Sequence, residues 1–287
     1  MMQNKAFQGT VIVSDMDGTF LGKNSALVPR NLKAIEYFCK NGGVFTLATG
    51  RCIQALKVLF PNPEDFVNGP AILCGGAYLY DFKAKKAFDP IPLNAIKLLP
   101  ILENIQAQIP DAGYRISFEG GFLCPNLTPF LEEKLVSMKK LICLDELRSH
   151  LNENWYKAVF CAHKDTIASI RRILSQIDLS DFSVTTSSPN LLEILDVNAS
   201  KGKKIGKIKD FYGPDSCIIC VGDYDNDLDM LAACDLPACP ENACEDVKKI
   251  ASIQLCNHQE GCIADLIYKL DDQNQKITKF SEEHYGQ

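Results

Sequence analysis

The stretch VIVSDMDGTFLG, residues 11–22, shapes the interpretation of the whole chain. Its first four residues are mostly apolar and are typical of a short strand that is buried on both faces. Asp15 and Asp17 then follow one residue apart, with a glycine and a threonine after them. Because like charges repel, such a pair belongs either to a simple turn, where Asp and Gly are common, or to a site where cations hold the carboxylates. The rest of the sequence distinguishes these interpretations.

Apolar strands and amphipathic helices alternate on both sides of this stretch. Strands are expected at 10–14, 43–48, within 70–81, and at 217–221, 236–239 and 252–256. Helices are expected at 31–42, 51–60, 201–212, 226–234, 242–251 and 261–270. Strands that alternate with helices form a parallel sheet with right-handed crossovers and helices on both faces. The pattern therefore predicts an α/β fold with a Rossmann-like three-layer core.

The middle of the chain has a different rhythm. Its expected elements are two hairpins at 114–126 and 182–197, a strand at 155–162 and a helix at 165–177. Hairpins combined with helices are typical of an α+β unit with an antiparallel sheet. The sequence therefore predicts a core made of residues 1–82 and 190–287, with an α+β domain inserted between them at 83–189.

The composition limits the class of partner. The chain has 287 residues, of which 46% are hydrophobic and 23% charged, and its formal net charge is −6. The length allows one large α/β domain or two domains. A negative net charge argues against non-specific nucleic-acid binding, which needs a basic face, but is compatible with an anionic substrate where a metal reverses the local field. No run of about 18 apolar residues occurs, so no membrane partner is expected.

The thirteen cysteines indicate a reducing compartment rather than a disulfide framework. Their number is odd, they are scattered among apolar residues, and the first ten residues lack the apolar segment of a secretory signal. We therefore expect a cytoplasmic protein in which the cysteines act as small buried hydrophobes. Cys217 and Cys220 match a redox spacing, but they lie within an apolar strand rather than at the start of a helix.

Further polar residues follow other strands or begin helices. They are Thr49, Gly50 and Arg51 after the second strand, Asp223, Asn226 and Asp227 after the strand at 217–221, and Lys201 at the start of a helix. In open α/β sheets, ligands bind outside the carboxyl ends of the strands. We therefore expect these residues, which come from distant parts of the chain, to meet Asp15 at one edge of one sheet.

The residue types at this edge favour phosphoryl chemistry. Carboxylates and a carbonyl suit Mg²⁺, which prefers hard oxygen ligands. A threonine beside backbone N–H groups binds a phosphate, and Lys201 offsets the charge of the carboxylates and of the phosphate. Asp15 is a candidate nucleophile that forms an aspartyl-phosphate. Asp17 projects to the same side and is a candidate general acid and base. With Mg²⁺ and Lys201 present, repulsion between Asp15 and its neighbours is tolerated.

Four motifs resemble those of the haloacid dehalogenase-like superfamily. They are DMDGTF (15–20), TLATGR (46–51), SKGKKI (200–205) and GDYDNDLDML (222–231). Their order, the long insertion and the segment HQEGCIADLI (258–267) resemble the Cof-type branch, which includes many phosphatases of sugar phosphates and other phosphorylated metabolites. The resemblance implies a catalytic core with a mobile cap that selects the substrate.

The resemblance also implies roles for individual residues. Asp15 is the nucleophile, and Asp17 is the general acid and base. The implied Mg²⁺ ligands are Asp15, the backbone carbonyl of Asp17, and Asp223. The implied phosphate-binding residues are Thr49, Gly50, Lys201 and Asn226. Asp227 and Arg51 have supporting roles, and for Arg51 bracing the core and contacting the substrate are equal alternatives.

Some features stand outside this pattern. After the third strand, Cys74-Gly75-Gly76 replaces the Asn-Gly that is common in the family, which puts a substrate contact by that asparagine in doubt. The lysines at 203, 204, 207 and 209 are expected on a solvated helix face. The four histidines show no mutual metal spacing and are expected in surface or loop positions.

We therefore expect a Mg²⁺-dependent phosphatase that acts on small phosphorylated metabolites such as sugar phosphates. A phosphomutase of the same superfamily is an alternative, but it needs a cap with strong anion-binding groups, and no arginine cluster is evident there. A non-enzymatic phospho-acceptor regulator is a second alternative, but receiver domains are shorter and lack the second aspartate. The sequence leaves the physiological substrate and the oligomeric state open.

Overall fold

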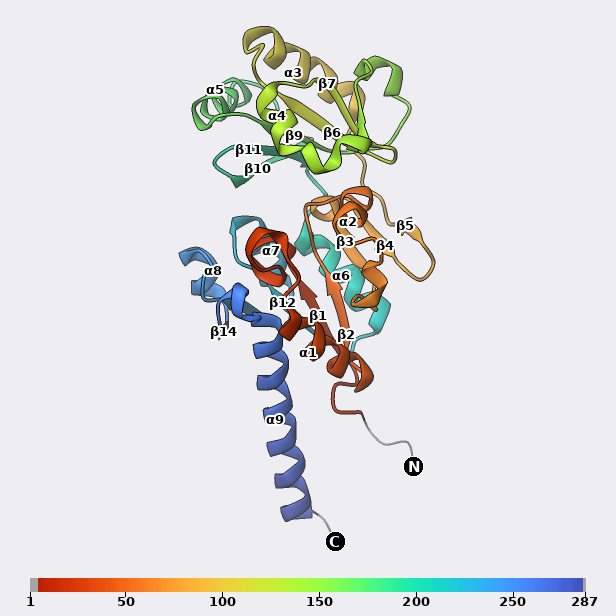
Figure 1. Cartoon of the computed structure of the whole chain (residues 1–287), viewed down its shortest axis with the longest axis vertical. Helices are drawn as coiled ribbons and strands as arrows, with labels where there is room; N and C mark the ends of the chain where they lie inside the picture. The colour runs from red at the N-terminus through yellow and green to blue at the C-terminus, as the bar shows by residue number, and fades with distance from the viewer. Residues whose placement is uncertain (1–4, 286–287) are drawn as a thin grey trace.

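The computed structural model describes residues 5–285, with all their side chains except those of residue 187 and of the residues after 273. The chain forms two units, one above the other in Figure 1, which we call the core and the cap. The core contains both ends of the described chain and a parallel sheet, and the cap, mostly green, contains a separate sheet. None of the helices in the described part of the chain combines the length and the apolar character that a membrane span requires.

Five parallel strands form the central sheet of the core. In sheet order they are β14 (Ile253–Leu255), β13 (Leu236–Pro240), β12 (Cys217–Val221), β1 (Thr10–Ser14) and β2 (Val44–Leu47). At the end of β1, Ser14 pairs with Val221 on one side and with Leu47 on the other. The three strands therefore end level with one another, and the residues that follow them start from one edge of the sheet.

Helices cover both faces of this sheet. On one face, α1 (Pro29–Lys40), α2 (Ile53–Leu59) and α9 (Cys262–Tyr285) pack in one cluster with Ile12 of β1. On the other, α6 (Lys201–Tyr212), α7 (Leu228–Ala233) and α8 (Glu245–Ile250) pack with Val11 and Val13. Alternate residues of a strand point to opposite faces, so a strand between two helical layers is apolar throughout. The predicted three-layer α/β core is confirmed.

The cap is built on a six-stranded sheet. In sheet order its strands are β10 (Phe182–Ser188), β11 (Leu191–Asp196), β9 (Trp155–Cys161), β6 (Tyr114–Phe118), β7 (Gly121–Asn126) and β8 (Ile142–Cys143). Neighbouring strands are antiparallel, except that β7 and β8 are parallel. Helices α3 (Ala95–Gln108) and α5 (Lys164–Leu174) pack on one face, and the short α4 (Pro129–Lys134) follows β7. The predicted antiparallel sheet is thus present, with one parallel pair at its edge.

Strand alternation gives the cap sheet two different faces. Ala158 and Phe160 of β9, like Ile194 of β11, are buried beneath α3 and α5. Lys157 and Glu193, on the same two strands, point to the opposite face, which borders a cavity shared with the core. The cap therefore presents polar side chains to the edge of the core sheet.

Each of the two predicted boundaries between core and cap falls between paired strands of a sheet. At the first, β3 (Ala71–Leu73), β4 (Tyr78–Asp81) and β5 (Lys86–Phe88) form a small antiparallel sheet, and the boundary expected after residue 82 falls between two of its paired strands. At the second, β11 pairs with β9 and β10, so the boundary expected after residue 189 divides a hairpin. We therefore propose that the cap comprises residues 89–196.

Candidate active site

The predicted site residues lie at the carboxyl edge of the parallel sheet. Asp15 follows β1 directly, and its amide donates a hydrogen bond to the carbonyl of Val221 at the end of β12 (2.8 Å). Asp223 comes two residues after that strand. Thr49 follows β2, and its amide donates to the carbonyl of Ile72 (2.9 Å). The pairing of β1 with both neighbouring strands thus brings residues from distant parts of the chain to one place.

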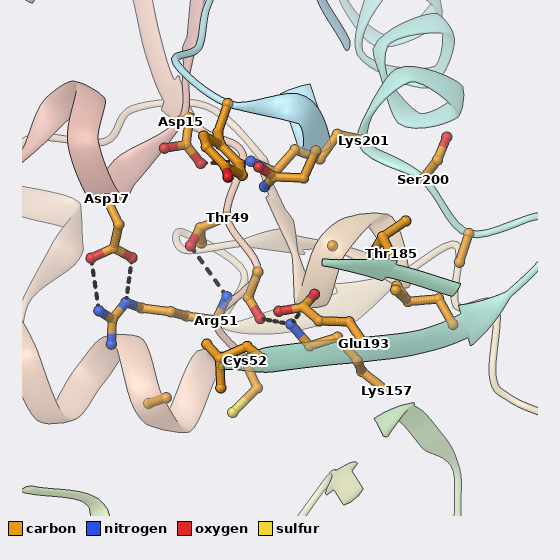
Figure 2. Close-up of a pocket in the computed structure, with 18 of the residues that line it drawn as sticks. Asp15, Asp17, Thr49, Arg51, Cys52, Lys157, Thr185, Glu193, Ser200 and Lys201 are labelled. Carbon is orange, nitrogen blue, oxygen red and sulfur yellow. Dashed lines mark hydrogen bonds and ion pairs between the residues drawn. The ribbon is translucent and has the colours of Figure 1, made fainter. Parts of the chain in front are cut away.

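Lys201 lies between two carboxylates in the interior of the site, beside Asp15 in Figure 2. It is the first residue of α6, and the Ser200 side chain caps this helix by accepting a hydrogen bond from the amide of Lys203 (3.1 Å). Lys201 Nζ lies 2.6 Å from Asp15 Oδ1 and 2.6 Å from Asp227 Oδ1. All three charged side chains are buried, so each charge is compensated by its neighbours rather than by water.

Burial and neighbouring charges set the ionisation of these groups. Burial raises the pKa of Asp15 well above its usual range, and the Asp227 carboxylate raises it further. Burial alone would lower the pKa of Lys201, but attraction to Asp15 and Asp227 outweighs it and raises that pKa above its ordinary value. Burial, together with Asp227, raises the pKa of Asp223 to about 6. Three carboxylates thus lie close together with Lys201 between two of them, and a further cation would favour their ionised forms.

The carboxylates of Asp15, Asp223 and Asp227 are grouped closely enough to hold a metal ion. One oxygen atom from each lies within 4.8 Å of the others. Thr19 Oγ1 donates to Asp223 Oδ1 (2.8 Å) and orients that carboxylate. A donor set made of oxygen atoms alone is the kind that Mg²⁺ prefers. Asp227, for which a supporting role was expected, lies within this group, whereas the Asp17 carboxylate is not part of it.

Gly18 permits the close packing of the Asp15–Thr19 turn against Asp223. Its φ is +90°, a conformation that L side chains rarely adopt. A Cβ atom at this position would lie 2.4 Å from Asp223 Oδ2, so that carboxylate would have to move. Asn242 Nδ2 donates to the Gly18 carbonyl (2.8 Å) and holds the turn from outside. The glycine of the Asp-x-Asp-Gly sequence is therefore required by both its backbone angle and its contact.

Asp17 is turned toward Arg51 rather than toward Lys201 (Figure 2). Arg51 Nε and Nη2 donate to the two carboxylate oxygens of Asp17 at 2.9 and 2.8 Å. The Asp17 side chain is half exposed and lines the cavity, as Arg51 does. Of the two alternatives for Arg51, the structure favours neither directly, because its guanidinium is bound to the predicted acid–base residue.

The four predicted phosphate-binding residues, which are Thr49, Gly50, Lys201 and Asn226, all line the cavity. Thr49 Oγ1 accepts a hydrogen bond from the amide of Arg51 (3.2 Å), which fixes the loop after β2. The carbonyl of Gly50 accepts a hydrogen bond from Nζ of Lys157 (2.7 Å), a residue of cap strand β9. The cap therefore contacts the predicted phosphate-binding loop directly.

A cavity of about 820 Å³ lies between the core and the cap. This volume is typical of a site for a small molecule. Its cap side includes Arg115, Lys134, Lys157, Ser183, Thr185 and Glu193. The two units also meet beside it, where α2 packs against the 3-10 segment η5 (Val136–Leu141) and β10 against η7 (Asp225–Asp227). The cap thus closes over the carboxylates in this arrangement.

Lys157 and Glu193 of the cap also line the cavity, and neither was predicted from the sequence. Lys157 Nζ lies 3.0 Å from Glu193 Oε2, and both side chains are largely removed from solvent. Arg115 lies near a predicted hairpin, where a solvated charge was expected rather than a ligand contact, but it lines the cavity, and its guanidinium lies 4.3 Å from the centre of the Phe122 ring. A signal for Lys157 was available, because it is the only charged residue in the otherwise apolar strand WYKAVFC.

Cys74, where the family commonly has asparagine, is buried. Burial raises the pKa of its thiol to about 12, so the thiol stays protonated at neutral pH. All thirteen cysteines lie between residues 39 and 262 of the described chain and are unpaired. Seven are buried, five are half-buried, and Cys217 is exposed, so the expectation that they act as buried hydrophobes holds for about half of them.

Residues 12–267 match the model of a family described as haloacid dehalogenase-like hydrolase. The chain is 24% identical over 270 residues to 5-amino-6-(5-phospho-D-ribitylamino)uracil phosphatase YitU of Bacillus subtilis, covering 88% of this chain and 94% of that protein. It is 25% identical over 272 residues to pyridoxal phosphate phosphatase YbhA of Escherichia coli, covering 90% and 97%. A solved haloacid dehalogenase-like hydrolase from Bacteroides thetaiotaomicron has a TM-score of 0.80 at 19% identity, covering 92% and 99%. This last likeness shows the fold.

Proposed function

Since the chain belongs to the haloacid dehalogenase-like hydrolase family and is a phosphoester hydrolase, we propose that it is a Mg²⁺-dependent phosphatase of small phosphorylated metabolites, sugar phosphates among them, that works through an aspartyl-phosphate on Asp15. The observation that carries the proposal is Lys201 held between Asp15 and Asp227, with Asp223 beside them, at the edge of a cavity of about 820 Å³. The two relatives are named as phosphatases of small phosphorylated compounds, which supports the same substrate class.

In the first step, a carboxylate oxygen of Asp15 attacks phosphorus and the bond between phosphorus and the ester oxygen breaks. Asp17 gives its proton to the departing alkoxide. Lys201 holds Asp15 in place through its 2.6 Å contact and offsets negative charge. The hydroxyl of Thr49 and the backbone N–H groups around Gly50 bind the phosphoryl oxygens.

In the second step, a water molecule attacks the phosphorus of the aspartyl-phosphate. Asp17, now ionised, takes a proton from that water. The bond between phosphorus and the Asp15 oxygen breaks, which releases inorganic phosphate and restores the carboxylate. Asp15, Asp223 and the backbone carbonyl of Asp17 would hold Mg²⁺, with Asp227 in support. When bound, the ion supplies neutralisation of the charge on the phosphoryl group.

The experiment that tests this proposal measures phosphate release from a panel of phosphorylated metabolites, in Mg²⁺ and in EDTA. We expect turnover in Mg²⁺, loss of turnover in EDTA, and loss in Asp15→Asn. Asp210→Asn makes the same change at an exposed position of α6 and is the matched control. The ranking of rates across the panel identifies the substrate class.

Two results would contradict the proposal. The first is no release from any compound by protein that is folded, as judged by circular dichroism, and that binds Mg²⁺. The second concerns the lifetime of phosphorylated Asp15 after labelling with a small phosphodonor. Rapid decay is expected of a phosphatase, whereas a species that persists for hours would indicate a phospho-acceptor regulator.

A further inference from the structure

A second group of possible metal ligands lies in the cap. Cys143 is in the edge strand β8, Asp145 follows it, and His150 ends the 3-10 segment η6 (Leu147–His150). One ligand atom from each residue lies within 4.8 Å of the others. The group offers sulfur, oxygen and nitrogen ligands, whereas the catalytic carboxylates offer oxygen alone. None of its three residues lines the active-site cavity.

The surroundings of His150 hold its ring in one orientation. Its Nδ1 lies 2.8 Å from a carboxylate oxygen of Glu153, and its Nε2 lies 3.3 Å from Asp145 Oδ2. The side chain is only 14% exposed, and its ring meets the Phe118 ring edge-on at 5.8 Å between centres. Its carbonyl accepts a hydrogen bond from Trp155 Nε1 (3.0 Å), which anchors the backbone.

This orientation is the one that a metal-binding histidine requires. Such histidines usually donate one ring N–H to a carboxylate, which leaves the other nitrogen free to bind the metal. Here Glu153 takes the Nδ1 side, and Nε2 points toward Asp145, whose carboxylate also contacts the Cys143 thiol. The three ligand atoms thus face one another, while the outer partner lies on the far side of the ring.

We propose that Cys143, Asp145 and His150 form a binding site for Zn²⁺, with Glu153 as the outer hydrogen-bond partner of His150. A mixed set of sulfur, nitrogen and oxygen ligands suits Zn²⁺, whereas Mg²⁺ prefers oxygen alone. Three protein ligands leave the fourth tetrahedral position for a water molecule. Cys143 binds as the thiolate, so binding releases its proton to solvent and weakens as the pH falls.

The position of the site gives it a structural consequence. The ion joins β8, a strand of only two residues at the edge of the cap sheet, to the turn that leads into β9. The segment η5, which comes directly before β8, is the part of the cap that packs against α2 of the core. Bound Zn²⁺ therefore stabilises the cap edge that contacts the core, and this inference is independent of the proposed phosphatase activity.

The test uses Co²⁺ as a spectroscopic substitute for Zn²⁺. Co²⁺ is titrated into the full-length, reduced protein in excess Mg²⁺, which occupies the oxygen-only site of Asp15 and Asp223. We expect a thiolate-to-cobalt charge-transfer absorption that saturates at one equivalent and disappears when one equivalent of Zn²⁺ is added. Oxygen ligands alone do not produce this absorption, so the catalytic site does not contribute to it.

Substitutions assign the absorption to individual residues. Cys143→Ser and His150→Gln are expected to abolish the absorption. Cys39, like Cys143, is half-buried, but it lies in the core, and Cys39→Ser is expected to leave the absorption unchanged. Glu153→Gln retains the thiolate and is expected to keep the absorption but to weaken Zn²⁺ affinity by about 10–100-fold, as for other outer partners of metal ligands.

A second measurement uses the unaltered chain. Zn²⁺ is expected to slow alkylation of Cys143 by iodoacetamide, measured by mass spectrometry of its peptide, with Cys39 as the internal reference. The inference is overturned by an absent charge-transfer absorption, by an absorption that survives Cys143→Ser, or by alkylation of Cys143 that saturating Zn²⁺ does not change. In those cases the residues form an acid–base cluster only.

Discussion

In the core, charged side chains reach the cavity from residues that follow strands or begin helices, whereas Lys157 and Glu193 of the cap reach it from within strands. In the core, Asp15 follows β1, and Lys201 begins α6. In the cap, Lys157 and Glu193 lie within β9 and β11. Both lysines are buried, but Lys201 is neutralised by carboxylates of the core alone, whereas Lys157 contacts Glu193 of the cap and the Gly50 carbonyl of the core.

This difference indicates that the core and the cap have different roles in the site. The contacts of Lys201 all lie within one unit, so its position does not depend on where the cap lies. The contact of Lys157 with Gly50 exists only while the cap lies against the core. We therefore infer that the core carries the chemistry, and that Lys157 makes the geometry of the phosphate-binding loop depend on the cap. Substitutions in the two regions are expected to separate these roles.

Loss of Lys201 is expected to have the largest effect. Lys201→Met leaves Asp15 and Asp227 buried with no cation between them. We expect kcat to fall by about 10³-fold, the upper range for loss of one preorganised electrostatic contact. We expect the free energy of unfolding to fall by about 3 kcal/mol, as for a broken buried ion pair. Steady-state kinetics and denaturant unfolding measure the two effects, with Lys207→Met, exposed on the same helix, as control. Equal activity of the two variants would contradict the assigned role.

The cap lysine is expected to have the next largest effect. Lys157→Met removes the contact with Gly50 and leaves Glu193 without its buried cation. We expect kcat/KM to fall by about 10²-fold, as for a small displacement of a positioning group. The double variant Lys157→Met, Glu193→Leu is expected to recover most of the lost unfolding free energy, because both members of a buried pair are replaced. It should not recover the rate, since the contact with Gly50 remains absent. Recovery of both would show that the pair serves only the folding of the cap.

The same difference explains what the sequence could predict. The strands at 10–14 and 217–221 and the helix at 201–212 have the bounds that were expected. Each strand is a short, mostly apolar run after which an aspartate follows within two residues, so the pattern marks the end of the strand and the side chain that leaves the sheet there. Asp15 and Lys201 were therefore recognisable without knowledge of the fold.

The cap residues were not recognisable in this way. Which face of β9 presents Lys157 to the cavity depends on how β9 pairs with its neighbours, and on which face the helices cover. Helix α3 contains Pro100, which usually ends a helix, and no helix was assigned there. Lys204, expected on a solvated face, is buried and pairs with Asp89, a residue at the first junction. The proximity of His150 to Cys143 depends on how the chain folds back between β8 and β9, which the sequence pattern does not predict.

Gly18 and Gly213 of the core allow the effect of backbone strain to be measured apart from the effect of a steric contact. Gly18 and Gly213 both have positive φ, at +90° and +93°, but only a Cβ at Gly18 would collide with Asp223. Each change to alanine is expected to cost about 1 kcal/mol of unfolding free energy from strain. Only Gly18→Ala is expected to weaken Mg²⁺ binding, by about 10–100-fold, because it displaces a carboxylate next to the ion. Calorimetric titration with Mg²⁺ measures this, and equal affinities in the two variants would exclude the contact as the cause.

The smallest effect is expected for Arg51, whose bond to Asp17 lies at the cavity surface between the two regions. Arg51→Met frees the Asp17 carboxylate to rotate, so proton transfer to the leaving group becomes less efficient. We expect kcat/KM for an alkyl phosphate to fall by about tenfold, a fraction of what general acid catalysis contributes. For p-nitrophenyl phosphate, whose leaving group needs no proton, the change should be much smaller. The ratio of the two rates is the measurement, because a loss of substrate binding would lower both. An equal loss on both substrates would assign Arg51 to phosphate binding, and no loss on either would reduce its pair with Asp17 to a surface contact.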